Sequence, residues 1–572
     1  MIRSFPLLIA AWWAVCGPAF AKPNVLVVIT DDQGYGDLGF HGNPVLKTPN
    51  LDAFAKRSVR FNRFYVSPVC SPTRSSLLTG RYTYRTGIVD TFLGRSMMHG
   101  DETTLAEVLK DGGYRTGLFG KWHLGDNYPM RPQDQGFQTV LMHRGGGIAQ
   151  PSDPPGGSNY QDPVLFENGV EKKFTGYVTD IFTDAAIKFV NTKANEPFFA
   201  YVAYNCPHSP FQVQDADWEP YKNINDGMFP KIGQPWLTGK FDATEAGKAY
   251  GMIANIDRNF QKLINAVPED TLVIFLTDNG VGGNRWNAGL RNRKGTVYEG
   301  GTRAQCFMSW KAKWKESKEI TTPAAHIDLF PTILEACGVK IPKALKIDGR
   351  SLLALIENGK PLEDRTLFLQ WHRGDVPELY RAFTAIGGKY KLVQASGAIP
   401  PAKGKNDPKW KFELFDIPND PFEEHDLAAK LPDEVAKLKT KYEAWFADVK
   451  STRQFAPPRI AVGAKQQPVT VLTRQDWRGD RAGWQPGDLG EWMIDVTQSG
   501  TYRLTLNVNP VDRKRTVSIG IGDGATMIAF EPKETKHVVE KMKLEKGEAT
   551  VRPSSDDRAI QIQSVTLERI GN

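Results

Sequence analysis

The sequence predicts an α/β fold in which a mostly parallel sheet is sandwiched by helices. Three short, almost purely apolar runs support this prediction, at residues 24–29, 198–204 and 271–276. Such runs are typical of parallel strands that are buried on both faces. Residues 104–110 and 180–190, which lie between these strands in the chain, carry apolar side chains at helical spacing. Strands that alternate with helices indicate a parallel sheet.

The part of the chain that begins near Arg365 has a different pattern. Short strand-like segments follow one another closely, at residues 366–371, 382–386, 390–394 and 411–415. A helical segment then covers residues 434–449. This order of elements indicates a smaller α+β subdomain.

A third region follows the linker that Pro457 and Pro458 indicate, because consecutive prolines continue neither helices nor strands. Its segments alternate apolar and polar residues, at 502–508, 516–521, 527–530 and 559–567. This alternation predicts a C-terminal β-sandwich module. The predicted organisation is a signal peptide at 1–21, an α/β domain at 22–365, an α+β subdomain that completes it at 366–455, and the β-rich module at 456–572.

The N-terminus has the pattern of an export signal. Arg3 precedes an apolar run at residues 5–15, and Ala19-Phe20-Ala21 resembles a cleavage site. We expect cleavage after Ala21 and an exported protein, periplasmic or secreted. The run is shorter than the about 20 residues that span a bilayer, and no later run is long and apolar enough, so no transmembrane segment is expected. A lipid anchor on Cys16 is a minor alternative.

Length, charge and cysteines exclude some classes of protein. A chain of 572 residues can form several domains and a large core. The net charge of +7 mildly favours anionic ligands, but the charges are dispersed, so nucleic-acid binding is not expected. Outside the leader, Cys70, Cys206, Cys306 and Cys337 are too few for a disulfide scaffold. Spacing cannot decide whether Cys306 and Cys337 form one bridge.

The segment Cys70-Ser71-Pro72-Thr73-Arg74 places a thiol and a fixed cation at the start of a predicted helix. Pro72 fits the first helical turn, where its missing N–H is not needed. Cys70 would then lie beside unpaired backbone N–H groups that favour an anion, and Arg74 could hold an anionic group. The alternative is a buried cysteine before an ordinary helix.

Four polar clusters follow four predicted strands. They are Asp31-Asp32, Lys121-Trp122-His123, Asn205-Cys206-Pro207-His208 and Asp278-Asn279-Gly280. In open α/β sheets, ligands bind beyond the carboxyl ends of the strands, so we expect the clusters to converge on one site. An aspartate after a strand is, taken alone, more often a turn former or a helix cap.

The oxygen atoms of these clusters suit a metal ion. Asp31, Asp32, Asp278 and Asn279 offer three carboxylates and an amide oxygen, which hard divalent cations prefer. Cysteine and histidine are too sparse there for zinc. A flexible oxygen cage suits Ca²⁺ better than Mg²⁺, which requires a strict octahedron. We therefore expect Ca²⁺, with Mg²⁺ as the alternative.

The motifs resemble those of the sulfatase family, of the formylglycine-dependent arylsulfatase type in the alkaline phosphatase superfamily. The resemblance rests on Cys-x-Pro-x-Arg at 70–74, Gly-Lys-Trp-His-Leu-Gly at 120–125, Pro-His-Ser-Pro at 207–210 and the block at 294–303, in the family's order. It covers roughly residues 23–452. Ala304 stands where the family often has a proline, which puts a local loop in doubt but no catalytic position.

The resemblance implies a nucleophile and its metal ligands. A maturation enzyme would oxidise Cys70 to formylglycine (3-oxoalanine), whose hydrated aldehyde would supply the nucleophilic hydroxyl. The modified residue would join Asp31, Asp32, Asp278 and Asn279 around the Ca²⁺ that sulfatases of this type commonly hold. Asp278 would also help to activate the hydroxyl.

The resemblance also implies roles for five cationic or titratable residues. Arg74 and Lys121 would stabilise the hydrated aldehyde. His208 and Lys294 would bind the sulfate, and one of them would act as general acid for the departing alcohol. His123 would take a proton from the second hydroxyl.

The expected substrate is a sulfate ester on a carbohydrate, with small aryl sulfates as adventitious substrates. Polar and aromatic loop residues are candidate sugar contacts, each at least as compatible with a structural role: His143, Arg144, Trp286, Trp371, His372 and Arg373. The Gly- and Pro-rich stretch 145–157 could shape the entrance. In the C-terminal module, Trp477, Trp484 and Trp492 fit core packing better than binding of polysaccharide.

Two alternatives stay open. A hydrolase of the same superfamily could act on phosphonate or phosphate esters, which share the tetrahedral anionic geometry. A non-catalytic glycan-binding protein could use the same scaffold. The joint presence of Cys70, Arg74, His208 and Lys294 argues against the binding protein, which needs no oxidisable nucleophile.

Overall fold

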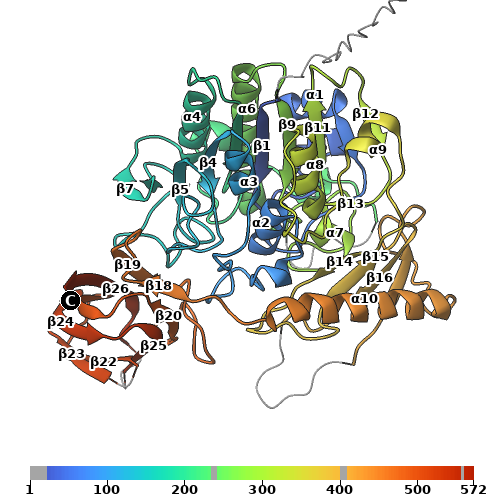
Figure 1. Ribbon diagram of the computed structural model, residues 1–572. Coiled ribbons are helices and arrows are strands. Elements are labelled where there is room, and N and C mark those ends of the chain that lie inside the picture. Colours follow the sequence, from blue (N-terminus) through green and yellow to red (C-terminus); the bar gives the residue numbers. More distant parts are fainter. Residues whose placement is uncertain (1–21, 234–240, 400–408, 523, 556–558, 572) are drawn as a thin grey trace, which may run out of the picture.

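The structure is a computed structural model that describes residues 22–233, 241–399, 409–522, 524–555 and 559–571 (Figure 1). The expected signal peptide with its cleavage site, and Cys16, lie outside these residues. A ten-stranded sheet with the order β12-β2-β11-β9-β1-β8-β4-β5-β6-β7 forms the centre of the larger part of the molecule. Helices cover both faces of this sheet, which confirms the predicted α/β fold class.

The predicted apolar strands form the middle of this sheet. β1 (Val25–Thr30) pairs in parallel with β8 (Phe198–Ala203) on one side and with β9 (Leu272–Thr277) on the other. β4 (Arg115–Lys121) continues the parallel order beside β8. Every residue of β1, β8 and β9 is buried, as the apolar runs predict. The carboxyl ends of these four strands therefore lie at one edge of the sheet.

Antiparallel strands lie toward both sides of this parallel core. β11 (Cys306–Trp310) pairs with β9, and β6 (Val164–Glu167) pairs with β5 (Thr139–His143). The remaining strands of the sheet are β2 (Val59–Phe61), β7 (Val170–Lys173) and β12 (Lys318–Ile320). A separate small sheet consists of β3 (Phe64–Tyr65), β10 (Arg303–Ala304) and β13 (Ala324–Ala325).

Alternate residues of β1 enter two hydrophobic cores. Val25, Val27 and Ile29 face one core, and Leu26 and Val28 face the other. The helices of the first core are α2 (Cys70–Thr79), α3 (Leu105–Asp111) and α8 (Leu329–Ala336). Those of the second core are α1 (Pro49–Lys56), α4 (Val178–Val190) and α6 (Ala243–Ala266). The shorter helices are α5 (Asp215–Trp218), α7 (Glu299–Thr302) and α9 (Leu353–Asn358).

The predicted α+β pattern corresponds to an antiparallel sheet covered by one long helix. The sheet consists of β14 (Leu367–Gln370), β15 (Phe383–Ile386), β16 (Tyr390–Gln394) and β17 (Glu413–Asp416). α10 (Pro432–Arg453) packs on it, with the ring of Tyr442 stacked 3.6 Å from that of Phe383. Strands and helix are those predicted, with ends that differ by a few residues.

The C-terminal region consists of two sheets packed face to face, as predicted. One has the order β18 (Ile460–Val462), β20 (Trp492–Val496), β25 (Gly547–Ser554), β22 (Arg515–Ile521), β23 (Gly524–Phe530). The other has the order β19 (Val469–Thr473), β26 (Ile562–Gly571), β21 (Gly500–Val508), β24 (Lys536–Leu544). The core between them contains Trp477 and Trp492, both fully buried.

Sequence reasoning missed some strands of this module. β24 lies at an edge and carries four lysines or glutamates on its exposed positions, a composition that protects sheet edges and hides the strand pattern. The four cysteines of the described chain are free and buried, so the possible bridge between Cys306 and Cys337 is not formed. Among the described residues, no helix combines the length and the apolar character that a membrane crossing requires.

Candidate active site

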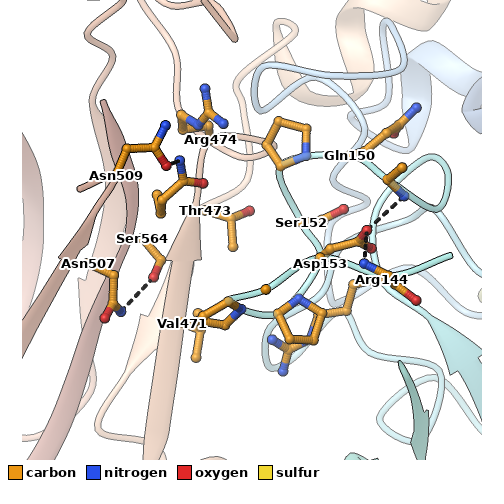
Figure 2. Close-up of a pocket in the computed structure, with 18 of the residues that line it drawn as sticks. Arg144, Gln150, Ser152, Asp153, Val471, Thr473, Arg474, Asn507, Asn509 and Ser564 are labelled. Atoms are coloured by element: carbon orange, nitrogen blue, oxygen red, sulfur yellow. Dashed lines mark hydrogen bonds between the residues drawn. The ribbon is translucent and has the colours of Figure 1, made fainter. Parts of the chain in front are cut away.

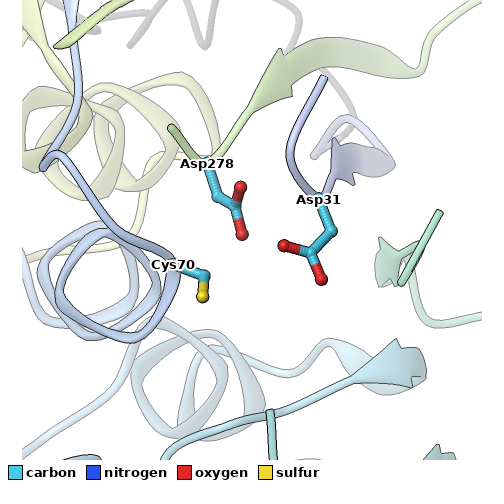
Figure 3. Close-up of side chains that lie close together, drawn as sticks. All are labelled: Asp31, Cys70 and Asp278. Atoms are coloured by element: carbon cyan, nitrogen blue, oxygen red, sulfur yellow. The ribbon is translucent and has the colours of Figure 1, made fainter. Parts of the chain in front are cut away.

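The loops at the carboxyl ends of β1, β4, β8 and β9 bring the four polar clusters together. Asp31 and Asp278 follow neighbouring strands, and their backbones are tied to the same edge by the bonds Asp31 N–H to Cys206 C=O (3.1 Å) and Asp278 N–H to Thr30 C=O (3.1 Å). Figure 3 shows the side chains of Asp31 and Asp278 pointing toward the thiol of Cys70. Each of these three side chains offers one atom that could bind a metal ion, and these three atoms lie within 4.8 Å of one another. The sequence clusters therefore converge on one site.

Cys70 is the first residue of α2, so its side chain lies beside the free N–H groups of the first helical turn. The residue is 2% exposed. Burial raises the pKa of its thiol, and the positive charges of Lys121 and Lys294 oppose that effect. The structure thus combines an anion-favouring helix end with two cations around one buried thiol.

Arg74 lies one helical turn after Cys70 and on the same face of α2. Its Nη2 and Nε donate to Oδ2 of Asp278 at 2.7 and 3.1 Å, and its Nη1 donates to the carbonyl of Lys121 at 3.2 Å. Both members of the pair are fully buried. Burial, together with the charge of Asp31, raises the pKa of Asp278 to about 6, although Arg74 lowers it.

Two buried oxygen atoms of the expected metal ligands have no hydrogen-bond partner among the described residues. Lys121 donates to Oδ2 of Asp31 at 2.7 Å, which leaves Asp31 Oδ1 without a partner. Asn279 uses its Nδ2 to donate to Asp32 at 2.9 Å, which leaves Asn279 Oδ1 without a partner. Unpaired buried oxygens are costly unless a donor or a cation satisfies them, so the residues present fit a hard divalent cation.

Asp32, Lys294 and His208 form the side of the site that faces a cavity. Lys294 donates to Oδ1 of Asp32, and its Nζ lies 3.9 Å from the sulfur of Cys70. Nε2 of His208 lies 3.9 Å from Oδ2 of Asp32. Burial raises the pKa of Asp32, but the positive charges of Lys294 and His208 outweigh this effect and hold that pKa below its usual value. Burial lowers the pKa of His208 to about 4. The negative charge of Asp32 raises this pKa, and the positive charge of Lys294 lowers it further.

His123 lies near Cys70 and is held by two hydrogen bonds. Ser71 donates to its carbonyl at 2.7 Å, and its Nε2 lies 2.6 Å from the carbonyl oxygen of Thr91. A carbonyl only accepts, so Nε2 carries the proton and Nδ1 is a bare acceptor. Nδ1 is buried without a partner among the described residues. Burial and the charge of Lys121 lower the pKa of His123 well below its usual value, which keeps the ring neutral.

A cavity of 540 Å³ opens above these residues. Its size suits a ligand of a few tens of atoms. Sequence analysis did not assign Phe92 and Arg293, which line it together with Trp484 of the C-terminal module. Gly146 and Gln150, from the stretch 145–157 that we expected to shape the entrance, also line it. The signal for the two missed residues was weak: Arg293 precedes Lys294, and Phe92 lies on a loop that carries no motif.

The six candidate sugar contacts differ in whether they line this cavity. Trp371 and Arg373 line the cavity above Cys70. Trp286, His143 and His372 are buried and do not line it, so the structural alternative holds for these three: their polar or aromatic faces are used in packing and in local hydrogen bonds. Arg144 lines a neighbouring cavity, as does part of the stretch 145–157.

Comparison with known protein families gives two matches. A family model described as Sulfatase matches residues 23–339. A second model, described as N-sulphoglucosamine sulphohydrolase, C-terminal, matches residues 291–449. Together they span the ten-stranded sheet, the four-stranded sheet and nearly all of α10.

Individual relatives agree with these models. Arylsulfatase A of Bos taurus is 31% identical over 510 residues, which is 80% of this chain and 93% of the relative. N-acetylgalactosamine-6-sulfatase of Homo sapiens is 29% identical over 62% of this chain and 69% of the relative. The solved structure of Ps i-CgsB in complex with k-i-k-neocarrahexaose has a TM-score of 0.62 and 27% identity, and covers 76% of this chain and 94% of that one.

Proposed function

The chain belongs to the sulfatase family and is a sulfuric ester hydrolase, and from this premise we propose that it removes sulfate from a glycan with a nucleophile formed at Cys70. The observation that supports this proposal most directly is the buried set of Cys70, Asp31 and Asp278, surrounded by three cations that each contact a carboxylate of the site. A sulfate ester is a tetrahedral anion, and such a wall of fixed donors stabilises charge on its oxygens.

The proposal includes the oxidation of Cys70 to formylglycine and the binding of a divalent cation. The matured residue would supply the attacking hydroxyl, and the cation would supply positive charge beside it. Asp31, Asp32, Asp278 and Asn279 would hold the cation. The unpaired oxygens of Asp31 and Asn279 support this assignment, and the all-oxygen set favours Ca²⁺ over Mg²⁺.

The residues of the chain itself would orient the substrate and move protons. Arg74 fixes Asp278 through two hydrogen bonds, so that the carboxylate stays directed at the nucleophile. Lys294 and His208 face the cavity and would bind the sulfate oxygens, with one of them donating a proton to the departing alcohol. Nδ1 of His208 donates to the carbonyl of Ser209 at 2.6 Å, so its Nε2 would act as a donor only in the doubly protonated ring, which a bound anionic substrate favours. Nδ1 of His123 would accept the proton that must leave the nucleophile before the next turnover.

A glycan substrate is supported by the cavity and by a relative. Trp371, Phe92 and Trp484 give the cavity an aromatic side on which a sugar ring can stack. Ps i-CgsB, which is 27% identical, was solved with a bound neocarrahexaose. The N-terminal pattern of Arg3 followed by an apolar run supports export to the periplasm or beyond.

The decisive experiment joins mass spectrometry with activity. The protein is coexpressed with a formylglycine-generating enzyme, the mass of the peptide that contains Cys70 is determined, and sulfate release from nitrophenyl sulfate is measured. We expect formylglycine at Cys70 and activity that falls at least 1,000-fold in Cys70→Ala. Cys337→Ala, which removes another buried free thiol, is the matched control and should keep most of the activity.

Other results would select an alternative. Faster turnover of nitrophenyl phosphate or of a phosphonate ester than of the sulfate would assign the site to phosphorus esters. An unmodified Cys70 together with no turnover of any ester, under conditions in which a control sulfatase matures, would favour a non-catalytic glycan-binding protein.

A further inference from the structure

A second cavity, of 910 Å³, lies where the α/β domain meets the C-terminal module (Figure 2). We call it the junction groove. One wall is the loop of residues 149–159. The opposite wall is the outer face of the sheet β19-β26-β21-β24, with the side chains of Val471, Thr473, Asn507, Ser564 and Thr566. The groove therefore exists only because the C-terminal module packs against the α/β domain.

The junction groove adjoins the cavity of 540 Å³ above Cys70, which we call the catalytic cavity. Gln150 and Trp484 line both of them. At the other end, Arg144, Glu171 and Val471 line both the junction groove and a third cavity of 270 Å³. The three cavities thus follow one another outward from Cys70, and an extended molecule could occupy this succession better than a compact one.

Aromatic side chains connect the two larger cavities. Arg373 lies over the rings of Trp371 and Phe92, with 5.4 and 4.4 Å from its guanidinium carbon to the ring centroids. The ring of Phe92 meets that of Trp484 edge to face at 5.2 Å. Nε1 of Trp484 donates to the carbonyl of Arg474 at 3.2 Å, which holds the indole at the mouth of the groove. Trp371 is buried, whereas Phe92 and Trp484 are partly exposed, and partly exposed aromatic faces suit the apolar faces of sugar rings.

Amide side chains line the wall that the C-terminal module provides. Asn507 donates to Ser564 at 3.0 Å, and Gln563 donates to Asn509 at 2.5 Å. The register between β21 and β26 shifts at Gln563, and this bulge turns its side chain toward the groove. Each amide offers both donors and an acceptor, as the hydroxyl groups of a sugar do, so such side chains can exchange their mutual bonds for bonds to a glycan.

The charges of the junction groove balance. Arg144 and Arg474 are matched by Asp153 and Glu171. Asp153 accepts from the backbone N–H groups of Ala149 and Ser158 at 2.7 and 3.1 Å, so its charge stabilises its own loop. A second anionic group would find no surplus of cations here. The groove therefore suits hydroxyl groups rather than sulfate.

We propose that the junction groove binds the unsulfated stretch of a carbohydrate chain whose sulfated unit occupies the catalytic cavity. The preferred substrates are then oligosaccharides or polysaccharides, and the C-terminal module forms part of the substrate site. This inference rests on the proposed sulfatase function, because it takes the cavity above Cys70 as the position of the sulfated unit.

The first test compares long and short substrates. Size-fractionated oligosaccharides, from disaccharide to octasaccharide, are prepared from a partially desulfated galactan and from a partially desulfated glycosaminoglycan, so that most units carry free hydroxyl groups, and nitrophenyl sulfate serves as the small substrate. The readout is the ratio of kcat/KM for a hexasaccharide to kcat/KM for nitrophenyl sulfate. We expect this ratio to fall about tenfold in the double variant Asn507→Ala/Asn509→Ala, because each lost hydrogen bond to the glycan weakens binding severalfold.

The matched control is the double variant Thr516→Ala/Thr526→Ala, which removes two polar side chains from the other sheet of the module. It should leave the ratio unchanged. A ratio that changes less than twofold in the asparagine variant overturns the inference, as does a wild-type kcat/KM that does not rise between disaccharide and hexasaccharide. Equal unfolding midpoints of the two double variants exclude a folding defect.

A binding measurement separates this inference from the proposed function. Calorimetry with Cys70→Ala and chemically desulfated hexasaccharides of the same two glycans requires no turnover. We expect binding that weakens about tenfold when Asn507→Ala/Asn509→Ala is added. Such binding, combined with a lack of sulfate-ester hydrolysis by the matured wild-type protein, would support the groove and refute the proposed function. Hydrolysis of sulfate esters without binding of either hexasaccharide would refute the groove alone.

Discussion

The catalytic cavity and the junction groove adjoin each other but differ in their chemistry. The first is built on buried ion pairs, in which Arg74 and Lys121 contact Asp278 and Asp31 with no exposure of any of the four side chains. The second is lined mainly by amides, hydroxyls, prolines and glycines with balanced charge. Buried charges stabilise a developing charge only when they are rigid, whereas neutral polar groups can adapt to the hydroxyls of different sugars.

The two regions also differ in the elements that position them. Most of the proposed catalytic residues follow four adjacent parallel strands, and Cys70 and Arg74 begin α2, which packs on the same sheet, so the core of the domain fixes them. The groove is formed by a loop and by the outer face of a separate sheet, so it can vary without disturbing the core. We therefore expect substitutions in the catalytic cavity to affect stability and chemistry together, and substitutions in the groove to affect substrate choice.

We expect the largest loss of stability and activity from a substitution of Arg74. Arg74→Met leaves Asp278 buried without its partner, and breaking a buried pair in this way destabilises proteins by about 3–5 kcal/mol. Denaturant unfolding should show this loss, and sulfate release should become undetectable. Arg503→Met, which removes an arginine paired at the surface with Glu540 and Glu568, should change neither stability nor activity noticeably. Equal stability of the two variants would contradict the central role of the buried pair.

A second prediction identifies the general acid. Removing the residue that protonates the departing alcohol should lower kcat by about 10²- to 10⁴-fold for a sugar sulfate, and much less for nitrophenyl sulfate, whose leaving group needs no proton. His208→Ala and Lys294→Ala are compared on both substrates. The variant with the larger difference between substrates lacks the acid, and equal losses on both substrates in both variants would exclude these two residues from that role.

A third prediction concerns the metal. Chelation should abolish activity, and Ca²⁺ should restore it more effectively than Mg²⁺. An ion present at 100 times its dissociation constant stabilises the folded protein by about 2.7 kcal/mol, which thermal unfolding would detect. Asp31→Asn should lose most of this stabilisation. Full activity after exhaustive dialysis against a chelator, with no metal found by elemental analysis, would be incompatible with the proposed site.

The smallest expected effect is a difference in salt dependence between the two regions. Screening weakens the attraction of an anionic substrate to the partly exposed Lys294 and to Arg373 at the cavity wall, so kcat/KM for nitrophenyl sulfate should fall severalfold between 50 and 500 mM NaCl. Affinity of Cys70→Ala for a desulfated hexasaccharide should change less than twofold, because the junction groove has balanced charge. A steep salt dependence of that affinity would mean that the groove binds charge.

Sequence patterns predicted most of the fold, because many helices and strands follow from the spacing of apolar residues in short segments. The fully apolar runs became β1, β8 and β9, and the alternating segments became β21 and β22. Strands whose pattern is masked by charge were missed, as at β24. Loop residues were the least predictable. Trp371 and Trp286 both lie in polar, aromatic loops, yet Trp371 lines the catalytic cavity and Trp286 packs against Phe229.

The sequence by itself determined the family, the fold class and the set of polar residues gathered at the strand ends, because each of these follows from short motifs and from the period of apolar residues. Only the tertiary structure decided which carboxylate pairs with which cation, that the oxygens of Asp31 and Asn279 are left without partners, and that Trp484 reaches the catalytic cavity. These features depend on distances between residues up to several hundred positions apart, and such distances are fixed by packing of the whole chain and not by any local pattern.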